Sequence, residues 1–488
     1  MSSFDLTIIG AGPGGYVAAI RAAQLGAGAK ICVVEKDELG GVCLNRGCIP
    51  TKALLKTAEV MAEVRAAEEF GINIFTPAIE PVIASKPGAD LGSAKILGPT
   101  LDLKRAMERK DQVVKTLVRG IDSLFKSWKI TTIKGTAKFV GRDKIFVATG
   151  AVAEEISAGA FIIATGSESA QIPLFPIDGN RILTSDHLLK MIEVPKSILI
   201  IGAGAIGCEW AFIMKNFGAE VTVIEMLDQV APTEDEMIGT LLAREMKKLK
   251  IKIILSDKIV KVDQGEDGVT AKTESGQELK AQKMLVSIGR APNSKGIGLE
   301  AAGVETDARG FVKVNARLET SVQKIYAIGD VAGGMLLAHK ASAEGKVAVA
   351  NALGKNEEMD YSVIPAAIFT SPEVASVGLR EKDAKEKGIN YATSSFPIRA
   401  LGKAQAMGEI AGEIKMVFDK GSLQLLGCHI IGARASDLIH EAALAIKMGA
   451  KISDIADTIH AHPTLSEGLM EAAEAGLGMA IHLPKSKS

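Results

Sequence analysis

Long apolar runs, a large number of cysteines and an excess of charge of one sign are all missing from this 488-residue sequence. No uninterrupted apolar run reaches the roughly 18 residues that a membrane-spanning helix needs, so we expect no such helix. Five cysteines are too few, and oddly numbered, for a secreted disulfide framework. A net charge of −1, without basic stretches interleaved with aromatics, argues against nucleic-acid binding.

Other absences narrow the class of protein further. The first predicted strand begins by Phe4, which leaves no room for a signal or transit peptide, so we expect a cytoplasmic protein. Cysteine and histidine do not cluster at ligand spacing, and we expect no metal site. Cys32, Cys208 and Cys428 lie in apolar patterns and are predicted core residues. Glycine, by contrast, is plentiful, and the length predicts about three domains.

Several glycines lie in the pattern of a dinucleotide-binding turn. A predicted strand, residues 5–9, leads into Gly10, Gly12 and Gly15, and a predicted helix follows. Gly10 allows the tight turn, Gly12 lets a pyrophosphate approach the backbone, and Gly15 lets the helix pack on the strand. Glu35 ends the next predicted strand, where it can accept ribose hydrogen bonds. An ordinary glycine turn is the alternative, but strand, helix and acid together favour a dinucleotide.

A second fingerprint of the same kind follows later in the chain. The predicted strand 197–201 leads into Gly202, Gly204 and Gly207, and the next predicted strand ends in Glu225. An acid at this place disfavours a ribose 2′-phosphate, and no arginine follows it, so NAD is favoured over NADP. Two fingerprints predict two bound dinucleotides. A duplicated domain with one copy that does not bind is the alternative.

Residues 40–52, GGVCLNRGCIPTK, contain two closely spaced cysteines, Cys43 and Cys48. Pro50 indicates that a helix begins here. A thiol near a helix N-terminus has its thiolate favoured by the dipole, and Lys52 adds positive charge nearby. Two buried structural cysteines are the alternative, but the glycines, Pro50 and Lys52 make a poor core pattern. We therefore predict a redox pair.

This segment resembles the redox-active disulfide motif of the pyridine nucleotide–disulfide oxidoreductases. Within that family, residues 44–45 and 49–52 are most similar to the dihydrolipoamide dehydrogenases. Val42 and Arg46 stand where the family usually has threonine and a small apolar residue, which we expect to alter redox tuning and not the chemistry. The resemblance covers nearly the whole chain except residues 75–100, which we predict to be an inserted surface loop without a catalytic role.

The resemblance implies an α/β fold with two Rossmann-like dinucleotide-binding domains, for FAD and NAD, and a C-terminal α+β dimerisation domain. The implied FAD-binding domain has two parts, residues 1–155 and 286–355. The NAD-binding domain spans residues 156–285 between them, and the interface domain spans residues 356–488. A homodimer is implied as well.

A histidine segment near the C-terminus, HAHPTLSE, provides the predicted base. An imidazole can accept a proton near neutral pH, and a carboxylate five residues on can fix its tautomer. By resemblance the base is His462, its partner is Glu467, and the segment reaches into the site of the other subunit. His460 is the alternative base. The resemblance makes Cys43 the interchange thiol and Cys48 the thiol beside the flavin.

Further residues are implied to contact the cofactors. By resemblance, Glu209 pairs with Lys52 near the reactive edge of the flavin, and Asp330 holds the flavin's ribityl chain. His339 is interpreted as flavin-side packing and not as a catalytic base. The other cofactor contacts that the resemblance implies are Ala137, Thr165, Gly166, Gly289, Arg290 and Ala338.

Together these features imply an enzyme that reoxidises protein-bound dihydrolipoamide through the Cys43–Cys48 disulfide and FAD, and reduces NAD. Its implied partners are the lipoyl domain of the E2 component of a 2-oxo acid dehydrogenase complex, or the glycine cleavage H-protein. Glutathione reductase is the nearest rival, but it should prefer NADP and have arginines after Glu225. Mercuric reductase and high-molecular-weight thioredoxin reductase should end in paired cysteines, which this chain lacks. A purely structural scaffold subunit would not need Cys43, Cys48 and His462.

Overall fold

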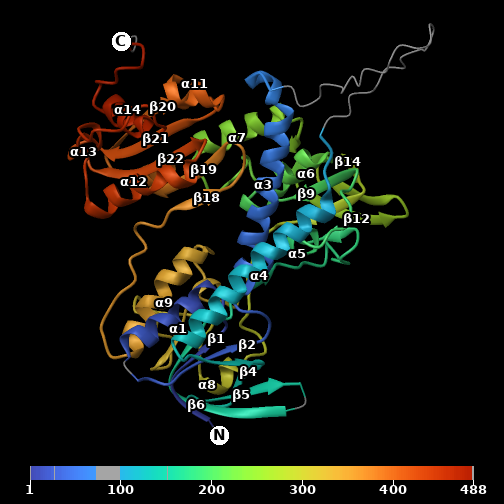
Figure 1. Cartoon of the computed structure of the whole chain (residues 1–488), viewed down its shortest axis with the longest axis vertical. Coiled ribbons are helices and arrows are strands. Elements are labelled where there is room, and N and C mark those ends of the chain that lie inside the picture. Colours follow the sequence, from blue (N-terminus) through green and yellow to red (C-terminus); the bar gives the residue numbers. More distant parts are fainter. Residues whose placement is uncertain (1, 27, 73–98, 151, 486–488) are drawn as a thin grey trace, which may run out of the picture.

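A computed structural model describes residues 2–26, 28–72, 99–150 and 152–485. The predicted inserted loop, residues 75–100, lies outside the described residues except for its last two positions. Figure 1 shows three lobes, each built around a sheet, with the long helices α3 (Cys48–Arg65) and α4 (Leu103–Ser127) running between them. No helix of the described part is long and apolar enough to cross a membrane.

The first lobe contains a seven-stranded sheet in the order β3-β2-β1-β6-β5-β4, with β17 also paired to β6. The strands are β1 (Ser2–Ile9), β2 (Ile31–Glu35), β3 (Thr131–Lys134), β4 (Thr136–Phe139), β5 (Lys144–Thr149), β6 (Val152–Ile163) and β17 (Ile325–Ala327). β3, β2, β1, β6 and β17 run parallel, whereas β4, β5 and β6 form an antiparallel meander.

Both faces of this sheet are covered, which explains its unbroken apolar strands. On one face Leu6 and Ile8 pack with Ala18 of helix α1 (Pro13–Leu25), which in turn packs on α9 (Ala338–Ala352). On the other face Ile9 packs with Phe139 from the meander, near the short helix α8 (Leu299–Ala302). The sheet is therefore a buried platform, and the ends of its strands are left to form a site.

The second lobe repeats the strand–helix–strand unit of the first. Its five-stranded parallel sheet has the order β11-β10-β9-β15-β8. The elements are β8 (Ile182–Leu183), α5 (Ser185–Leu188), β9 (Ser197–Ile201), α6 (Ala205–Phe217), β10 (Glu220–Ile224), α7 (Glu236–Lys248), β11 (Lys252–Ile254) and β15 (Lys283–Val286). An antiparallel sheet of β12 (Ile259–Gly265), β13 (Gly268–Thr273) and β14 (Glu278–Ala281) is inserted before β15. The antiparallel ribbon of β7 (Ser167–Ser169) and β16 (Arg290–Pro292) connects this lobe to the first.

The third lobe is built on an antiparallel sheet in the order β18-β19-β22-β21-β20. The strands are β18 (Ala366–Ile368), β19 (Glu373–Gly378), β20 (Tyr391–Pro397), β21 (Glu413–Asp419) and β22 (Leu425–Gly432). Its helices are α10 (Glu381–Glu386), α11 (Gly402–Met407), α12 (Ala435–Met448), α13 (Ile452–Ala456) and α14 (Glu467–Gly476), with a 3-10 turn η3 (Ile398–Ala400). Helix α12 packs on β19 and β22, and α14 packs on β20 and β21.

The predicted α/β class is confirmed, with two sheets of Rossmann type, the first of them extended by an antiparallel meander, and a C-terminal α+β unit. Most predicted elements lie within a few residues of their observed bounds. One element was not predicted: Cys43 lies on a helix of its own, α2 (Gly41–Arg46), which Gly47 separates from α3. The antiparallel sheet of β12, β13 and β14 was not predicted either.

Candidate active site

The first glycine turn follows β1 directly. Gly10 has φ +105°, in the region that favours glycine. A Cβ on Gly15 would lie 1.9 Å from the carbonyl oxygen of Gly10, so only glycine allows α1 to pack there. At Gly12 no heavy atom lies within 4 Å of a Cβ position, which leaves space for a phosphate at the N-terminus of α1. Glu35 Oε2 accepts a hydrogen bond from Ala11 N at 2.7 Å.

The second glycine turn, after β9, has the same geometry. Gly202 has φ +96°, and a Cβ on Gly207 would lie 2.0 Å from the carbonyl oxygen of Gly202. No heavy atom lies within 4 Å of a Cβ position at Gly204. Glu225 Oε2 accepts from Ala203 N at 2.8 Å. Each turn thus offers an open backbone position at a helix N-terminus and a carboxylate held by the turn's own amide.

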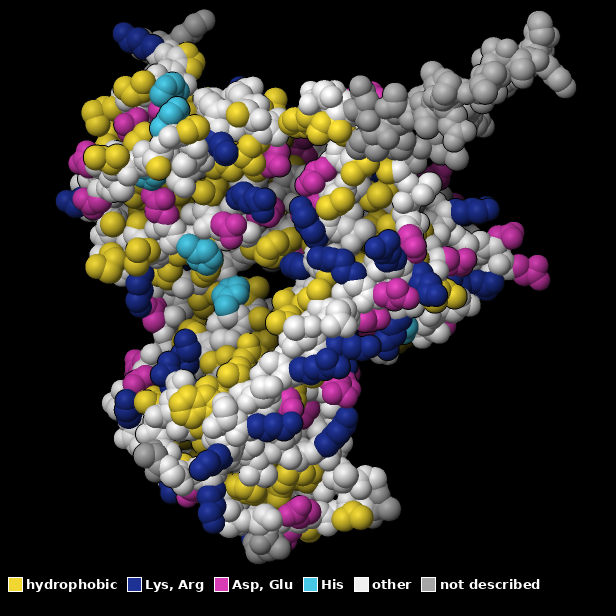
Figure 2. Space-filling view, in the orientation of Figure 1, with side chains coloured by type: hydrophobic (Ala, Val, Ile, Leu, Met, Phe, Trp, Pro, Cys, Tyr) yellow, Lys and Arg dark blue, Asp and Glu magenta, His cyan; other side chains and the backbone are white. Residues whose placement is uncertain are grey.

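A cavity of about 1300 Å³ extends from the first turn toward the other two lobes. In Figure 2 the molecule is hollowed where the lobes meet, with histidine side chains beside the hollow. The predicted residues that line the cavity are Gly10, Gly12, Glu35, Cys43, Cys48, Lys52, Ala137, Thr165, Gly166, Glu209, Arg290, Asp330 and Ala338. Those that do not line it are Gly15, Gly202, Gly204, Gly207, Glu225, Gly289, His462 and Glu467.

The two cysteines lie in this cavity wall as free thiols, Cys43 on α2 and Cys48 as the first residue of α3. The neighbouring Cys43 thiol is the largest influence on Cys48 and, with a smaller contribution from Lys52, outweighs burial and lowers the pKa of the Cys48 thiol to about 7. The neighbouring Cys48, together with burial, raises the pKa of Cys43 far above its ordinary value. In the reduced pair the negative charge therefore resides on Cys48.

Lys52 and Glu209 form the predicted ion pair. Lys52 Nζ lies 2.8 Å and 2.9 Å from the two carboxylate oxygens of Glu209, a bridge between α3 and α6. The ammonium also lies 4.3 Å from the centre of the Phe369 ring. Phe369 N donates to Glu209 Oε1 at 3.1 Å. The pair thus joins all three lobes beside the thiols.

Asp330 also lines the cavity, on the 3-10 turn η2 (Gly329–Ala332) that follows β17. Ser167 Oγ donates to Asp330 Oδ2 and accepts from Arg290 Nε at 2.7 Å. Arg290 Nη2 also donates to the carbonyl oxygen of Ser167 at 2.7 Å. Ser167 was not among the predicted site residues. The sequence feature that could have identified Ser167 is its position directly after the Thr165-Gly166 motif.

Arg46 is a second residue whose contacts the sequence did not predict. It lines the cavity from α2, pairs with Asp37 after β2, and places Nε 3.4 Å from Asp186 Oδ2 on α5. Asp37 and Asp186 come from different lobes. The arginine therefore ties the helix that contains Cys43 to both nucleotide-binding lobes.

The predicted dyad near the C-terminus is formed. His462 Nδ1 lies 2.8 Å from Glu467 Oε1, and Glu467 Oε2 accepts from Thr464 N at 2.8 Å. Burial raises the pKa of Glu467, but the Thr464 amide and His462 outweigh it and lower this pKa overall. The ionised carboxylate leaves Nε2 of His462 free to accept a proton. The His462 side chain is 76% exposed, and within one chain it lies outside the cavity of the thiols.

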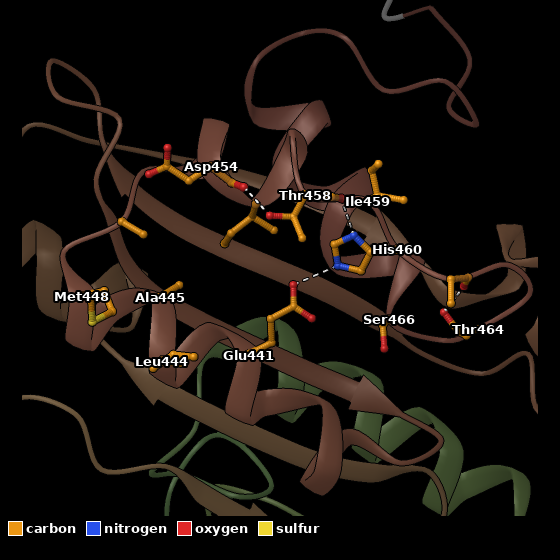
Figure 3. Close-up of a pocket in the computed structure, with 13 residues that line it drawn as sticks. Glu441, Leu444, Ala445, Met448, Asp454, Thr458, Ile459, His460, Thr464 and Ser466 are labelled. Carbon is orange, nitrogen blue, oxygen red and sulfur yellow. Dashed lines mark hydrogen bonds and ion pairs between the residues drawn. The ribbon is translucent and has the colours of Figure 1, made fainter.

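His460, the alternative base, lines a separate, open pocket of about 470 Å³ (Figure 3). Its Nε2 lies 2.9 Å from Glu441 Oε1, and its Nδ1 lies 2.8 Å from the carbonyl oxygen of Thr458. The His460 side chain is only 5% exposed. Both ring nitrogens lie within hydrogen-bond distance of protein oxygens, so the ring is held by the protein and is not presented to a substrate thiol.

The remaining candidates have structural contacts. His339 lines the cavity, but its Nε2 lies 2.7 Å from the carbonyl oxygen of Pro365. Cys32, Cys208 and Cys428 are buried, and burial raises the pKa of each thiol to about 12. They therefore behave as core residues and not as redox thiols.

Comparison with known proteins identifies the family of the whole chain. The family model for pyridine nucleotide-disulphide oxidoreductases matches residues 4–345, and the model for the family's dimerisation domain matches residues 364–473. A dihydrolipoyl dehydrogenase of Thermus scotoductus is 44% identical over 489 residues, 99% of each chain. One from Bacillus subtilis is 41% identical, over 99% of each chain. A mitochondrial dihydrolipoyl dehydrogenase of Arabidopsis thaliana is 40% identical over 98% of this chain and 91% of its own.

Solved structures extend the comparison. The HOCl-induced flavoprotein disulfide reductase RclA from Escherichia coli is 26% identical, with a TM-score of 0.82 over 96% of this chain and 99% of its own. LpdA from Mycobacterium tuberculosis shares the fold at 24% identity, with a TM-score of 0.86 over 97% of this chain and 99% of its own. The chain therefore belongs to the pyridine nucleotide-disulphide oxidoreductase family.

Proposed function

We propose that this chain acts as a dihydrolipoyl dehydrogenase, which oxidises dihydrolipoamide and reduces NAD⁺ with the help of FAD. The observation that carries the proposal is 40–44% identity, over nearly the whole chain, to several dihydrolipoyl dehydrogenases. The thiol pair in a cavity beside a glycine turn is the site that this activity needs. Glu225, with Met226 after it, fits NAD and gives no support to the glutathione reductase alternative.

The residues around the large cavity fit FAD. Gly12 leaves open space at a helix N-terminus for the pyrophosphate, Glu35 lies at the strand end where a ribose is recognised, and Asp330 offers a carboxylate for the ribityl chain. The cavity exceeds the roughly 300–1,000 Å³ of ordinary small-molecule sites. When bound, FAD would supply the acceptor for the electron pair of the thiols and the donor of hydride to NAD⁺.

The thiol chemistry follows from the different surroundings of the two cysteines. In the oxidised enzyme Cys43 and Cys48 form a disulfide. A dihydrolipoyl thiolate attacks Cys43, and Cys48 departs as the thiolate because the thiol of lower pKa is the better leaving group. The second dihydrolipoyl thiol then displaces Cys43, so the lipoyl disulfide forms and the cysteine pair takes up two electrons.

The proposed base is His462, oriented by Glu467. Its Nε2 takes the proton of the attacking dihydrolipoyl thiol, and the ionised Glu467 stabilises the imidazolium that results. Within one chain His462 is exposed and away from the thiols. The chain also has the dimerisation domain of its family. We therefore infer that each site is completed by His462 of the partner subunit of a homodimer.

We also propose the setting in which the site works. The lipoyl group would arrive on an E2 component of a 2-oxo acid dehydrogenase complex or on a glycine cleavage H-protein, in the cytoplasm. The proposed division is an FAD-binding domain of residues 1–155 and 286–355, an NAD-binding domain of residues 156–285, and an interface domain of residues 356–488. The order of the sheets along the chain supports three such units, but β6 (Val152–Ile163) crosses the proposed boundary at residue 155 and pairs with β1, so its second half belongs to the first sheet.

A steady-state assay tests the proposed function. The purified protein should reduce NAD⁺ with free dihydrolipoamide as donor, and should do so much less well with NADP⁺. A protein that instead reduces glutathione disulfide with NADPH would contradict the proposal. Lipoylated E2 domain and lipoylated H-protein, offered separately as substrates, then distinguish the two proposed partners.

A further inference from the structure

A buried ion pair lies on α9, beside the turn that contains Asp330. Lys340 Nζ lies 3.0 Å from Glu344 Oε1, and each side chain is only 1% exposed. The two residues are four apart, so they lie on the same side of the helix. Burial of two charges costs free energy that their mutual attraction rarely offsets in full. A pair at this depth is therefore poorly explained by stability alone.

The ion pair is bonded to the first residue of η2 and to the residue that follows its last. Glu344 Oε2 accepts from Gly329 N at 2.7 Å, and Lys340 Nζ donates to the carbonyl oxygen of Gly333 at 2.7 Å. Asp330 lies between these two bonded positions. The turn that presents the Asp330 carboxylate to the cavity is thus held by one ion pair, at its first residue and at the residue just after its last.

Tyr361 adds a third member from outside the helix. Its hydroxyl donates to Glu344 Oε1 at 2.7 Å. Burial and the neighbouring Glu344 raise the pKa of Tyr361 above its ordinary value, so the hydroxyl keeps its proton and remains a donor. Tyr361 lies in the segment between α9 and β18, which leads into the third lobe.

We propose that Lys340, Glu344 and Tyr361 form a positioning network that holds Asp330 in place for the ribityl chain of FAD. The network does not touch the cofactor and acts through the backbone of η2. This inference rests on the proposed function, since it takes FAD as the ligand of the large cavity. Loss of the network should weaken FAD binding by more than its effect on the stability of the fold explains.

Another buried ion pair provides a matched control. Lys415 Nζ on β21 lies 2.9 Å from Asp235 Oδ1 at the start of α7, with side chains 11% and 2% exposed. Neither residue lines the large cavity. Lys415→Met should therefore destabilise the fold as removal of a buried charge does, without a specific effect on the flavin.

The test measures the FAD dissociation constant of each purified holoenzyme by flavin fluorescence on dilution, together with its unfolding midpoint. Lys340→Met/Glu344→Gln removes both charges at once, so no unpaired charge is left buried. We expect it to weaken FAD binding about tenfold or more, and Tyr361→Phe to weaken it about threefold. Lys415→Met should lower the unfolding midpoint and leave the FAD dissociation constant within about twofold of wild type.

A second background decides whether the network acts through Asp330. If it does, Tyr361→Phe has little further effect on FAD binding in an Asp330→Asn protein, because the two changes remove the same interaction. Fully additive losses, or unchanged FAD affinity in both network variants, would overturn the inference. A wild-type protein that binds no flavin would instead overturn the proposed function, so the two failures are distinguishable.

Discussion

Cys43 and Cys48 share a motif of 13 residues, residues 40–52, yet their surroundings give them opposite acid–base behaviour. Cys48 begins α3, and the neighbouring Cys43 thiol and Lys52 lower its pKa. The neighbouring Cys48 and burial raise the pKa of Cys43, so Cys43 keeps its proton. This asymmetry assigns leaving-group character to one thiol and leaves the other as the point of attack.

The dyad at the C-terminus gives a prediction at the same scale. His462→Gln should lower turnover with dihydrolipoamide by about 10²–10⁴, because the substrate thiol loses its general base. Glu467→Gln should lower this turnover by a smaller factor, since the imidazole remains. Reduction of the bound flavin by NADH should be unchanged in both variants, because neither residue lines the large cavity. Steady-state and rapid-mixing kinetics measure the two half-reactions.

His460→Gln is the matched control for that prediction, because it removes a second imidazole from the same segment. The His460 ring is fixed by Glu441 and Thr458. Loss of this imidazole should lower the stability of the protein, and should lower dihydrolipoamide turnover less than His462→Gln does. A larger loss of dihydrolipoamide turnover in His460→Gln than in His462→Gln would reverse the assignment of the base.

A site residue was predictable from the sequence when the residues that define its role lie close to it along the chain. Cys43, Cys48, Lys52 and the two glycine turns are of this kind, and the pairing of Lys52 with Glu209 entered through the family resemblance. Ser167 was not predicted, because its role depends on Arg290 and Asp330, which join it only in the folded chain. No pattern in the sequence places those three side chains together.

At the scale of elements, the same strand–turn–helix unit occurs twice. Both copies were predictable from the apolar strand, the spacing of the three glycines and the helical pattern that follows them. Helix α2 was not predictable in the same way. Gly40 and Gly41 both have positive φ. Gly47, with φ −139° and ψ −115°, is not helical and separates α2 from α3. The glycines of this segment predict a loop from the sequence alone. In the folded chain the segment packs against α3 and α4 and forms a short helix.

The two copies allow a paired test. Gly12 has φ −66° and Gly204 has φ −71°, which alanine adopts without strain, and no protein atom lies within 4 Å of either Cβ position. Gly204→Ala should therefore fold normally, keep its FAD, and raise the KM for NAD⁺ about tenfold or more, because the methyl group occupies phosphate space.

Gly12→Ala should show the reverse, a folded protein purified with less FAD. Flavin absorbance per chain and the KM for NAD⁺ are the measurements. If Gly204→Ala lost FAD and kept its KM for NAD⁺, the assignment of the two turns would be exchanged. Unchanged values in both variants would show that neither turn receives a pyrophosphate.

For the whole molecule, a single chain leaves the base away from the thiols and apolar side chains open to solvent. Ile459 is 97% exposed, and Leu444 and Met448 on α12 are also exposed. Apolar exposure of this kind marks an interaction surface, and it lies within the family's dimerisation domain. A second copy of the chain would cover these residues and bring His462 to a neighbouring cavity.

Mixed dimers test this arrangement directly. Two differently tagged chains, one with Cys48→Ser and one with His462→Gln, are co-expressed, and the heterodimer is purified through both tags. If each site combines residues of two chains, one site of the heterodimer is intact and about half of the wild-type activity returns. The two homodimeric variants should be nearly inactive. A heterodimer as inactive as they are would place the base and the thiols in the same chain.

The most direct test of the redox relay is an anaerobic titration of the purified protein with dihydrolipoamide and then NAD⁺, followed by absorbance. Two-electron reduction should give a long-wavelength charge-transfer band from the Cys48 thiolate beside the flavin. Since the pKa of Cys48 is lowered to about 7, the band should be strong above that pH and fade as the pH falls through it. NAD⁺ should reverse the band, and Cys48→Ser should lack it. A flavin reduced without such a band, or a band that survives in Cys48→Ser, would contradict the assignment of Cys43 and Cys48 as the redox pair.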